Sequence, residues 1–236
     1  MTIRGQFYFT IYKKGVQTRR NQPELSRIMS LKSTETVFLQ VLLWKRNYKM
    51  TTTKDLSQLI PPHGGYRNLQ SYQMAEIVFD ATVTFCERFI DRRSRTHDQM
   101  VQAARSGKQN IAEGSTASGT SKKTELKLIG VARASLEELL LDFQDFLRQK
   151  ELPLWGKNDA KAKEIRALAY KSNRSYSTYK TYLEASLPEI AANAAICLIH
   201  QTNYLLDQQL RALEKEFLKE GGFTERLYRT RKKIKI

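Results

Sequence analysis

The chain has 236 residues, a length that suits one or two domains with a sizeable core. Lys and Arg number 40 against 24 Asp and Glu, so the formal net charge is +16. This charge favours a polyanionic partner such as RNA, DNA or an anionic membrane surface. The longest apolar run, residues 36–44, is interrupted by Gln40 and is far shorter than the roughly 20 residues that span a membrane. We therefore expect no membrane-spanning segment.

The positive charge is concentrated at the two ends of the chain. Residues 1–63 carry 11 basic and 3 acidic side chains, and residues 211–236 carry 9 and 4. Residues 64–210 carry 20 and 17, so the central part is nearly balanced. The division predicts a basic N-terminal extension over 1–63, a folded body over 64–222 and a basic tail over 223–236.

The N-terminal extension shows no clear amphipathic helix or hairpin. Its pattern changes at Pro61, Pro62, Gly64 and Gly65, which break regular structure, and a helical pattern follows. We expect that translation begins at Met50 and that residues 1–49 are an upstream extension; the alternative is a genuine disordered basic arm.

The two cysteines and the N-terminus bear on location. Cys86 and Cys197 lie far apart in apolar helical patterns, without the spacing of a metal site. They are expected to be buried thiols in a reducing compartment. The N-terminus has no standard signal peptide. A cytoplasmic protein is expected.

Two amphipathic helices are predicted first. One runs from about Ser71, its expected cap, to Ile90, and its apolar residues recur at intervals of three and four. The next begins with a capping box in which Thr96 is the N-cap and Gln99 lies three residues later. Small residues dominate the stripe of this second helix, which lets a neighbouring helix approach closely. Gly114 is placed to end it in the left-handed conformation.

The segment "GSTASGTSKK" after this helix raises the possibility of a phosphate-binding loop. Gly114 and Gly119 have the spacing of that motif, but Thr120 stands where its lysine belongs, and a helix precedes it instead of a strand. The segment is therefore predicted to be a connection between two helices, with Ser121 or a neighbour capping the next one.

Two further long helices are predicted. The third covers about residues 122–148 and stops before Pro153 and Gly156; the last runs from about Pro188 to Leu218 and ends at Gly221. Between them, residues 149–186 form an insertion with one short amphipathic piece around Ile165. Four long helices with mostly short connections predict an all-α fold, an up-down antiparallel four-helix bundle.

Asn110 and Glu113 are predicted to share a helical face in the last turn of the second helix. A glutamate is unfavourable at a helix C-terminus because of the helix dipole. We therefore expect Arg133, on the facing helix, to pair with Glu113 and fix the register of the two helices.

The blocks "DQMVQAARSGKQNIAEG" and "IGVARASLEELLLDFQDFL" resemble the bacterial four-helix bundle family. That family includes the intervening-sequence proteins of large-subunit ribosomal RNA genes and the accessory variability determinant of diversity-generating retroelements. The resemblance covers about residues 69–147 and extends more weakly to the final helix. The matching residues are Gln99, Ala104, Ser106, Asn110, Ile111, Ala112, Glu113, Gly114, Ala132, Arg133, Ser135, Leu136 and Glu138.

The resemblance implies a four-helix bundle, a ring-like homopentamer and a basic surface, with no catalytic residues. For the retroelement members it implies contact with reverse transcriptase and nucleic acid. The chain departs from short members of the family in its N-terminal extension, its 149–186 insertion and its basic tail. It looks like the subgroup described as four-helix bundle suffix-domain proteins.

Several groups of cations are candidate nucleic-acid contacts. Three lie in the linker between the first two helices, two on the second helix, two at the start of the third and the rest in the tail. These residues are Arg92, Arg93, Arg95, Arg105, Lys108, Lys122, Lys123, Arg226, Arg229, Arg231, Lys232, Lys233 and Lys235. For the loop and tail cations the alternative is a solvated surface or a solubilising disordered end.

Tyrosines in the insertion alternate with cations. Tyr170, Tyr176, Tyr179 and Tyr182 suit base stacking, but the same spacing suits packing of the insertion onto the bundle, which we favour. The chain's three histidines offer no Glu-x-x-His pair for a metal site in a bundle. No catalytic set, metal or cofactor is expected.

The predicted function is a non-enzymatic, oligomeric helical protein that binds nucleic acid or a nucleoprotein partner. The alternative is a structural protein–protein scaffold without nucleic-acid binding. The sequence does not decide between RNA and DNA.

Overall fold

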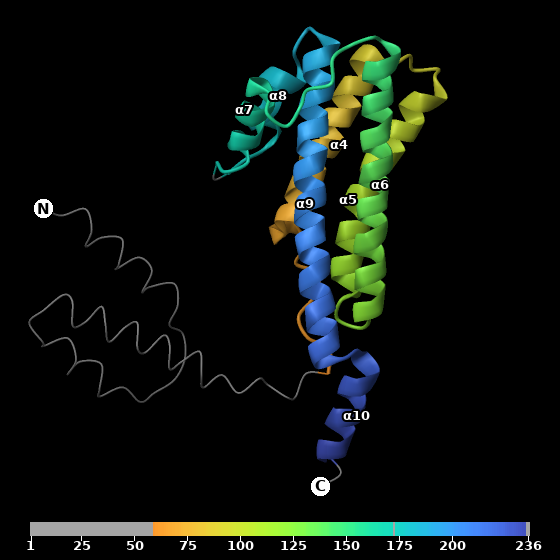
Figure 1. Ribbon diagram of the computed structural model, residues 1–236. Helices are drawn as coiled ribbons and strands as arrows, with labels where there is room; N and C mark the ends of the chain where they lie inside the picture. The colour runs from red at the N-terminus through yellow and green to blue at the C-terminus, as the bar shows by residue number, and fades with distance from the viewer. Residues whose placement is uncertain (1–58, 172, 235–236) are drawn as a thin grey trace, which may run out of the picture. The chain divides into compact units, whose positions relative to one another are not determined.

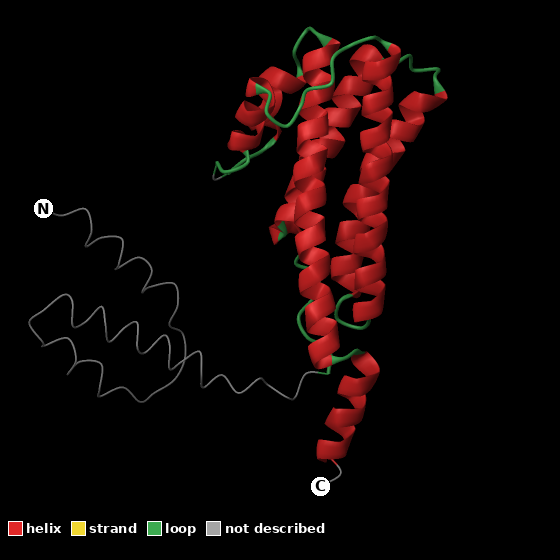
Figure 2. Ribbon diagram, in the orientation of Figure 1, coloured by secondary structure: helices red, strands yellow, loops and turns green. Residues whose placement is uncertain are grey.

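The computed structural model describes residues 59–171 and 173–234, apart from the side chain of Ile234, and this part of the chain is all-helical (Figure 1). Figure 2 shows helices joined by loops, and no β-strand occurs in these residues. The predicted all-α class is therefore confirmed. The predictions for residues 1–58, including the start at Met50, and for Lys235 lie outside the described residues. No described helix is long and apolar enough to cross a membrane.

The described helices comprise four long helices, three shorter ones and a single 3₁₀ turn. In chain order they are η1 Tyr66–Asn68, α4 Gln70–Phe89, α5 Arg95–Ala117, α6 Lys122–Gln149, α7 Ala160–Leu168, α8 Tyr176–Leu183, α9 Pro188–Glu220 and α10 Phe223–Ile234.

The four long helices enclose the main hydrophobic core. α4 packs against α5, α5 against α6, α6 against α9 and α9 against α4. In α4, α5 and α6 most core side chains recur at intervals of three and four, because such residues share one helix face, whereas residues 191–199 of α9 are all buried. Phe85 of α4 is central: its ring centroid lies 4.9 Å from those of Phe143 and Phe146 on α6. Burying one such side chain contributes about 1.5–3 kcal/mol.

The interface between α5 and α6 depends on small residues, as predicted. Ala104, Gly107 and Ile111 are buried on one stripe of α5. A Cβ atom added to Gly107 would lie 2.7 Å from Cδ2 of Leu136. Glycine is therefore required for the distance at which the two helices pack.

Three predicted helix ends are wrong in detail. Ser71 does not cap α4: it lies inside the helix, and its hydroxyl donates to Oε1 of Gln209 at 2.6 Å. Ser94, not Thr96, caps α5, and its Oγ accepts the Thr96 N–H. Gly114 does not end α5 either, because the helix continues to Ala117 and Gly114 is buried inside it.

The connection between α5 and α6 is a short turn, as predicted for this segment. Ser121 caps α6 by accepting the Thr124 N–H at 3.1 Å. The turn also receives the start of the described chain, because Ile60 and His63 lie against Gly119 and the Gly64 N–H donates to the Ser115 carbonyl. Folded structure therefore begins before the predicted boundary at residue 64.

The insertion forms two helices where the sequence predicts one. α7 packs against α9, and α8 packs against both α9 and α4. Tyr179 is fully buried, and the Tyr176 hydroxyl donates to Oγ1 of Thr84 on α4 at 3.1 Å. These two tyrosines pack the insertion onto the long helices, as predicted.

The basic C-terminal residues form a helix that the sequence pattern does not predict. α9 ends at Glu220, and its C-cap Gly221 has a φ of 71°, a conformation that favours glycine. The residues of the predicted basic tail form the helix α10, and none of its described residues is buried. The N–H of Gly222 donates to Oε2 of Glu225 at 2.9 Å, which fixes the first turn of α10.

Candidate binding groove

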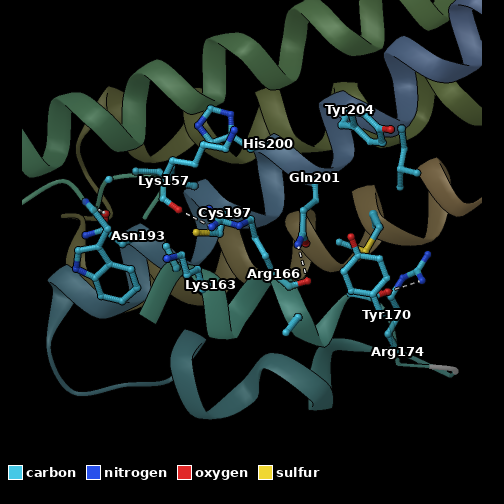
Figure 3. A pocket seen from close by; sticks show the side chains of 18 of the residues that line it. Lys157, Lys163, Arg166, Tyr170, Arg174, Asn193, Cys197, His200, Gln201 and Tyr204 are labelled. Atoms are coloured by element: carbon cyan, nitrogen blue, oxygen red, sulfur yellow. Dashed lines mark hydrogen bonds between the residues drawn. The ribbon is translucent and has the colours of Figure 1, made fainter. Parts of the chain in front are cut away.

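A groove of about 1080 Å³ runs along α9, between this helix and α7 (Figure 3). We call it the α9 groove. Its floor comes from residues Asn193 to Leu205 of α9, and its wall from the loop before α7, from α7 itself and from the residues after it. The first turns of α4 close one part of the wall. The volume slightly exceeds the usual range of small-ligand pockets, about 300–1000 Å³.

A buried amide fixes the loop at one side of the groove. Nδ2 of Asn193 donates to the carbonyl groups of Pro153 and Glu189, both at 2.9 Å, and its Oδ1 accepts the Trp155 N–H at 2.8 Å. Nε1 of Trp155 also donates to the Glu189 carboxylate at 2.8 Å. Because buried polar groups are costly unless paired, this fully bonded asparagine holds the loop against α9.

Four cations line the α9 groove, and none of the described residues that line it is Asp or Glu. They are Lys157, Lys163, Arg166 and Arg174 (Figure 3). The Arg166 guanidinium donates to the Lys157 carbonyl, and the Arg174 guanidinium donates to the Ala169 carbonyl at 3.0 Å. Both arginines are thereby held in place and keep further N–H groups for a ligand. The groove is built to attract an anion.

Aromatic rings lie beside these cations. Tyr170, directly after α7, is 90% exposed, and Tyr204 on α9 is 64% exposed. Trp155 is held differently: Nζ of Lys161 lies 5.2 Å from its ring centroid, and its Nε1 is bonded. The two tyrosines are therefore the free aromatic surfaces of the groove, and Trp155 is part of its wall.

The groove also contains polar groups that the protein does not pair. Nε of Arg174 and Oε1 of Gln201 are buried atoms without a hydrogen-bond partner among the described residues. Gln201 uses its other end, since Nε2 donates to the Arg166 carbonyl at 3.3 Å. An unpaired buried donor or acceptor costs about 1–3 kcal/mol. A ligand group placed beside either atom would recover part of that cost.

His200 contributes little positive charge to the groove at neutral pH. Loss of water around its ring lowers its pKa from 6.5, Arg133 and Arg166 act in the same direction, and only Glu137 opposes them. The anion attraction of the groove therefore comes from its lysines and arginines.

The structure does not bring the predicted linker and α5 cations into the groove. Arg92, Arg93 and Arg95 are exposed at the junction of α4 and α5, and Arg105 is exposed on α5. Lys108 is engaged within the fold, with its Nζ 4.3 Å from the Phe79 ring centroid. Arg95 lines a smaller pocket on α5 and α6, together with two carboxylates and no other predicted cation.

The sequence predicts that Lys122 is a free cation at the start of α6. In the structure it is instead held in ion pairs. Its Nζ lies 3.1 Å from a Glu125 carboxylate oxygen and 3.4 Å from a Glu216 oxygen, and its side chain is only 15% exposed. It pairs α6 with the last part of α9. Lys123 is exposed beside it.

The tail cations lie on α10. Arg231, Lys232 and Lys233 are exposed on its last turns. Arg229 is partly engaged, because its guanidinium donates to the carbonyl groups of Glu225 and Glu220. The cations of α10 remain a candidate polyanion-binding surface that is separate from the α9 groove.

The predicted pair of Glu113 with Arg133 is wrong. Arg133 instead contacts Glu137 at 2.5 Å and Asp207 at 3.2 Å, and so joins α6 to α9. Glu113 is exposed. The physical premise also fails, because α5 continues beyond Glu113, so its carboxylate does not face the end of a helix dipole.

The other residues of that motif have structural roles. Asn110 donates from Nδ2 to the carbonyl and hydroxyl oxygens of Ser106, at 2.9 and 3.1 Å. The hydroxyl oxygens of Ser106 and Ser135 lie 3.1 Å apart and link α5 to α6. Gly114 lets α6 approach: a Cβ there would lie 3.4 Å from the Glu125 carbonyl oxygen.

The two thiols are buried and unpaired, as predicted. Burial raises the pKa of Cys86 to about 12 and that of Cys197 to about 11. Both therefore stay protonated at neutral pH, whereas a nucleophilic cysteine acts as a thiolate. In the described part of the chain, no three His, Cys, Asp or Glu side chains are grouped to hold a metal ion.

The residues that build the α9 groove are not among the predicted sites. The only sequence signal is the alternation of tyrosines with cations in the insertion, which includes Tyr170 and Arg174. That signal does not include Tyr204 on α9, or Trp155 and Lys157 in the loop before α7.

Comparison of the chain with protein-family models, with curated proteins and with solved structures finds no match. The case for function therefore depends on the residues of the α9 groove.

Proposed function

We propose that this protein is a non-enzymatic helical protein that binds nucleic acid or a nucleoprotein partner through the α9 groove. The observation that carries the proposal is the groove lining, which combines four cations with exposed tyrosines and has no carboxylate among its described residues. Phosphate contacts need cations, and base contacts need exposed aromatic or hydrogen-bonding groups. The α9 groove supplies both in one place.

We further propose that α4, α5, α6 and α9 form the up-down antiparallel bundle of the family that the sequence resembles. Their packing in a closed order around one core supports this proposal. Assembly as a homo-oligomer, a pentamer by the same resemblance, belongs to the proposal. The exposed Val131 and Leu141 on α6 offer apolar surface for it. A reverse transcriptase is the partner that the resemblance suggests.

The proposal assigns the protein no chemistry of its own. Its support is the protonated state of both buried thiols, which removes the cysteines as nucleophiles. A cytoplasmic location fits two unpaired cysteines, which persist in reducing compartments.

Salt-dependent binding by the full-length chain tests this function. We would titrate a labelled RNA hairpin and a duplex DNA at several salt concentrations, by fluorescence anisotropy. Neutralising phosphates releases counterions, so the affinity should fall as salt rises. The groove variant is Lys157→Glu with Lys163→Glu, because both side chains are exposed and line the groove. It should bind at least about tenfold more weakly and show a salt slope smaller by about 1 to 2.

The matched control is Lys127→Glu with Lys215→Glu, which changes the charge equally at exposed positions outside the groove. Lys215 lies ten residues, or about 15 Å of helix, beyond Leu205 of the groove. If both variants lose the same affinity for nucleic acid, binding depends on the net charge of the protein, and the α9 groove is not the site. If the wild-type chain binds neither nucleic acid, the alternative of a protein–protein scaffold replaces the proposal.

A third variant separates the groove from α10. Arg231→Gln, Lys232→Gln and Lys233→Gln remove exposed cations from that helix. We expect this variant to retain most of the wild-type affinity. If it alone abolishes binding, the α10 surface is the site and the groove is not.

A further inference from the structure

We infer that the α9 groove takes a single-stranded segment of nucleic acid, with bases stacked on Tyr170 and Tyr204 and phosphates held by the groove cations. This inference rests on the proposed function and makes it specific. It concerns residues of the 149–186 insertion and of α9, which the sequence alone does not connect.

Two tyrosines of the groove leave their rings exposed. Tyr179 is buried and Tyr176 is bonded to α4, so these side chains account for docking of the insertion. Tyr170 and Tyr204 take no such part and leave their rings to solvent at the groove. An exposed aromatic face can stack on a nucleobase, which contributes about 1–3 kcal/mol per base. We therefore assign the two rings as stacking platforms.

Stacking on a protein ring selects single strands. The bases of a duplex are stacked on each other and paired, so their faces are closed to a protein side chain. A single strand offers its base faces and its phosphates together. Aromatic rings beside cations, as in the α9 groove, are the usual means by which proteins hold such strands.

The cations of the groove lie where they can hold the phosphates of such a strand. Arg166 and Arg174 are both tied to backbone carbonyl groups at the edge of the groove, which limits the entropy that they lose on binding. Lys157 and Lys163 are exposed beside them. A strand lying along α9 would place its phosphates on this side.

Two buried polar groups of the groove residues lack a hydrogen-bond partner among the described residues. Nε of Arg174 is a donor without an acceptor, and Oε1 of Gln201 is an acceptor without a donor, among the described residues. A phosphate oxygen matches the first, and a base amino group or a ribose hydroxyl matches the second. Both groups lie in the lining of the same groove.

The test compares a single strand with an abasic strand of equal charge, and then with a duplex and a mononucleotide. The full-length chain is titrated with a labelled single strand of about 12 nucleotides, within the usual range of site sizes. Further probes are an abasic strand of the same length, a duplex of the same sequence and a free mononucleotide as competitor. RNA and DNA versions are both used. We expect the single strand to bind at least about tenfold more tightly than the abasic strand or the duplex.

Variants connect this preference to the two rings. Tyr170→Ala with Tyr204→Ala should abolish the difference between single strand and abasic strand, because the bases then have no ring to stack on. Tyr170→Phe with Tyr204→Phe should keep the difference, because the ring faces remain. Tyr228→Ala, at an exposed tyrosine of α10, is the matched control and should keep it also. Unchanged thermal unfolding shows that each variant is folded.

The outcomes separate this inference from the proposed function. Equal binding of single strand, abasic strand and duplex overturns the stacking inference and leaves nucleic-acid binding in place. If the mononucleotide displaces the single strand completely and binds with the same affinity, the ligand of the groove is not a strand and the inference is overturned. Failure of every nucleic-acid probe to bind overturns the inference and the proposed function together.

Discussion

Two helix contacts in this protein have opposite characters. Between α5 and α6, the groups in contact are a glycine and small side chains, and Leu136 fills the space opposite Gly107 completely. Between α7 and α9, long basic and aromatic side chains line an open groove of about 1080 Å³. The surface pocket beside the first contact, about 430 Å³, is lined by charges of both signs, Arg95 with Asp98 and Glu138. The second presents cations and two exposed rings, with no carboxylate among its described lining residues, so we place the candidate site there.

The difference follows from the size and chemistry of a few side chains. On α5, residues one or two turns apart on the stripe are alanine and glycine, which bring two backbones together. On α7, Lys163 and Arg166 lie three residues apart and so share one face of the helix. Charged heads of this kind stay in contact with water, so this face of α7 stays open to solvent, whereas Ala162 and Ile165 of the same helix are buried.

Removing a side chain from each contact should give the largest contrast. Leu136→Ala leaves a cavity in the α5–α6 contact, where Leu136 is fully buried. It should lower the free energy of unfolding by about 2–5 kcal/mol. Tyr204→Ala in the groove should change it by less than about 0.5 kcal/mol, since the ring is mainly exposed. Urea unfolding followed by circular dichroism measures both.

Equal effects of the two substitutions would contradict the comparison. A loss of several kcal/mol on Tyr204→Ala would mean that its ring packs in the fold and is not free to stack. Nucleic-acid binding by the Leu136→Ala protein, measured where it is still folded, should match the wild type.

The glycines give a finer contrast inside the long helices. A Cβ at Gly107 would lie 2.7 Å from Leu136, and this side chain is fully buried, so it cannot move aside into solvent. A Cβ at Gly130 on α6 would meet nothing within 4 Å. Gly130→Ala should stabilise the protein by about 0.5–1 kcal/mol, because alanine favours a helix. Gly107→Ala should destabilise it by about 1 kcal/mol, since overpacking outweighs that gain. Thermal or urea unfolding of the pair decides the sign of each.

The long helices could be predicted from sequence because one physical rule fixes them. Apolar residues at intervals of three and four bury one face, and the core residues of α4 and α6 follow that pattern. The helix ends were less predictable. Ser71 and Gly114 have the chemistry of capping residues, but packing against other helices uses the first as an internal hydrogen-bond donor and the second as a site of close approach.

The α9 groove could be predicted only in part. Tyr170 and Arg174 belong to a visible alternation of rings and cations, but packing and stacking use the same spacing, and Tyr179 shows that packing is real in this segment. What separates Tyr170 from Tyr179 is burial, which depends on how the insertion docks. Tyr204 lies far along the chain from Tyr170 and joins it only through the contact of α7 with α9.

The pH dependence of stability should also distinguish the two contacts. Glu125 is buried where α6 begins, near Gly114 of α5; burial raises its pKa above 4.5, and Lys122 opposes the shift. The folded state then holds this proton more tightly than the unfolded chain. Between 4.5 and the raised pKa the unfolded state binds fewer protons, so stability falls as pH rises through that window. Lys122 keeps the effect modest.

Glu125→Gln removes the titrating group, so the decline of stability over this window should become shallower. Lys163→Gln, at an exposed lysine of the groove, should leave the profile unchanged. Urea unfolding at a series of pH values from about 4 to about 7 gives the slopes. An unaltered slope for Glu125→Gln would assign the pH dependence to other carboxyl groups, such as Asp142, whose pKa burial also raises.

The smallest expected effect concerns the ion pair that joins α6 to α9. A double-mutant cycle on Arg133 and Asp207 should give a coupling of about 0.5 kcal/mol, because both side chains are partly exposed and water screens the pair. The same cycle on Arg133 and Glu113 should give a coupling near zero, since Glu113 is exposed and Arg133 contacts Glu137 and Asp207 instead. A clear coupling with Glu113 would mean that the ion pair of Arg133 joins α6 to α5 and not to α9. The ion pair would then stabilise the closely packed contact, whereas the structure places it on α9, the helix that forms the floor of the groove.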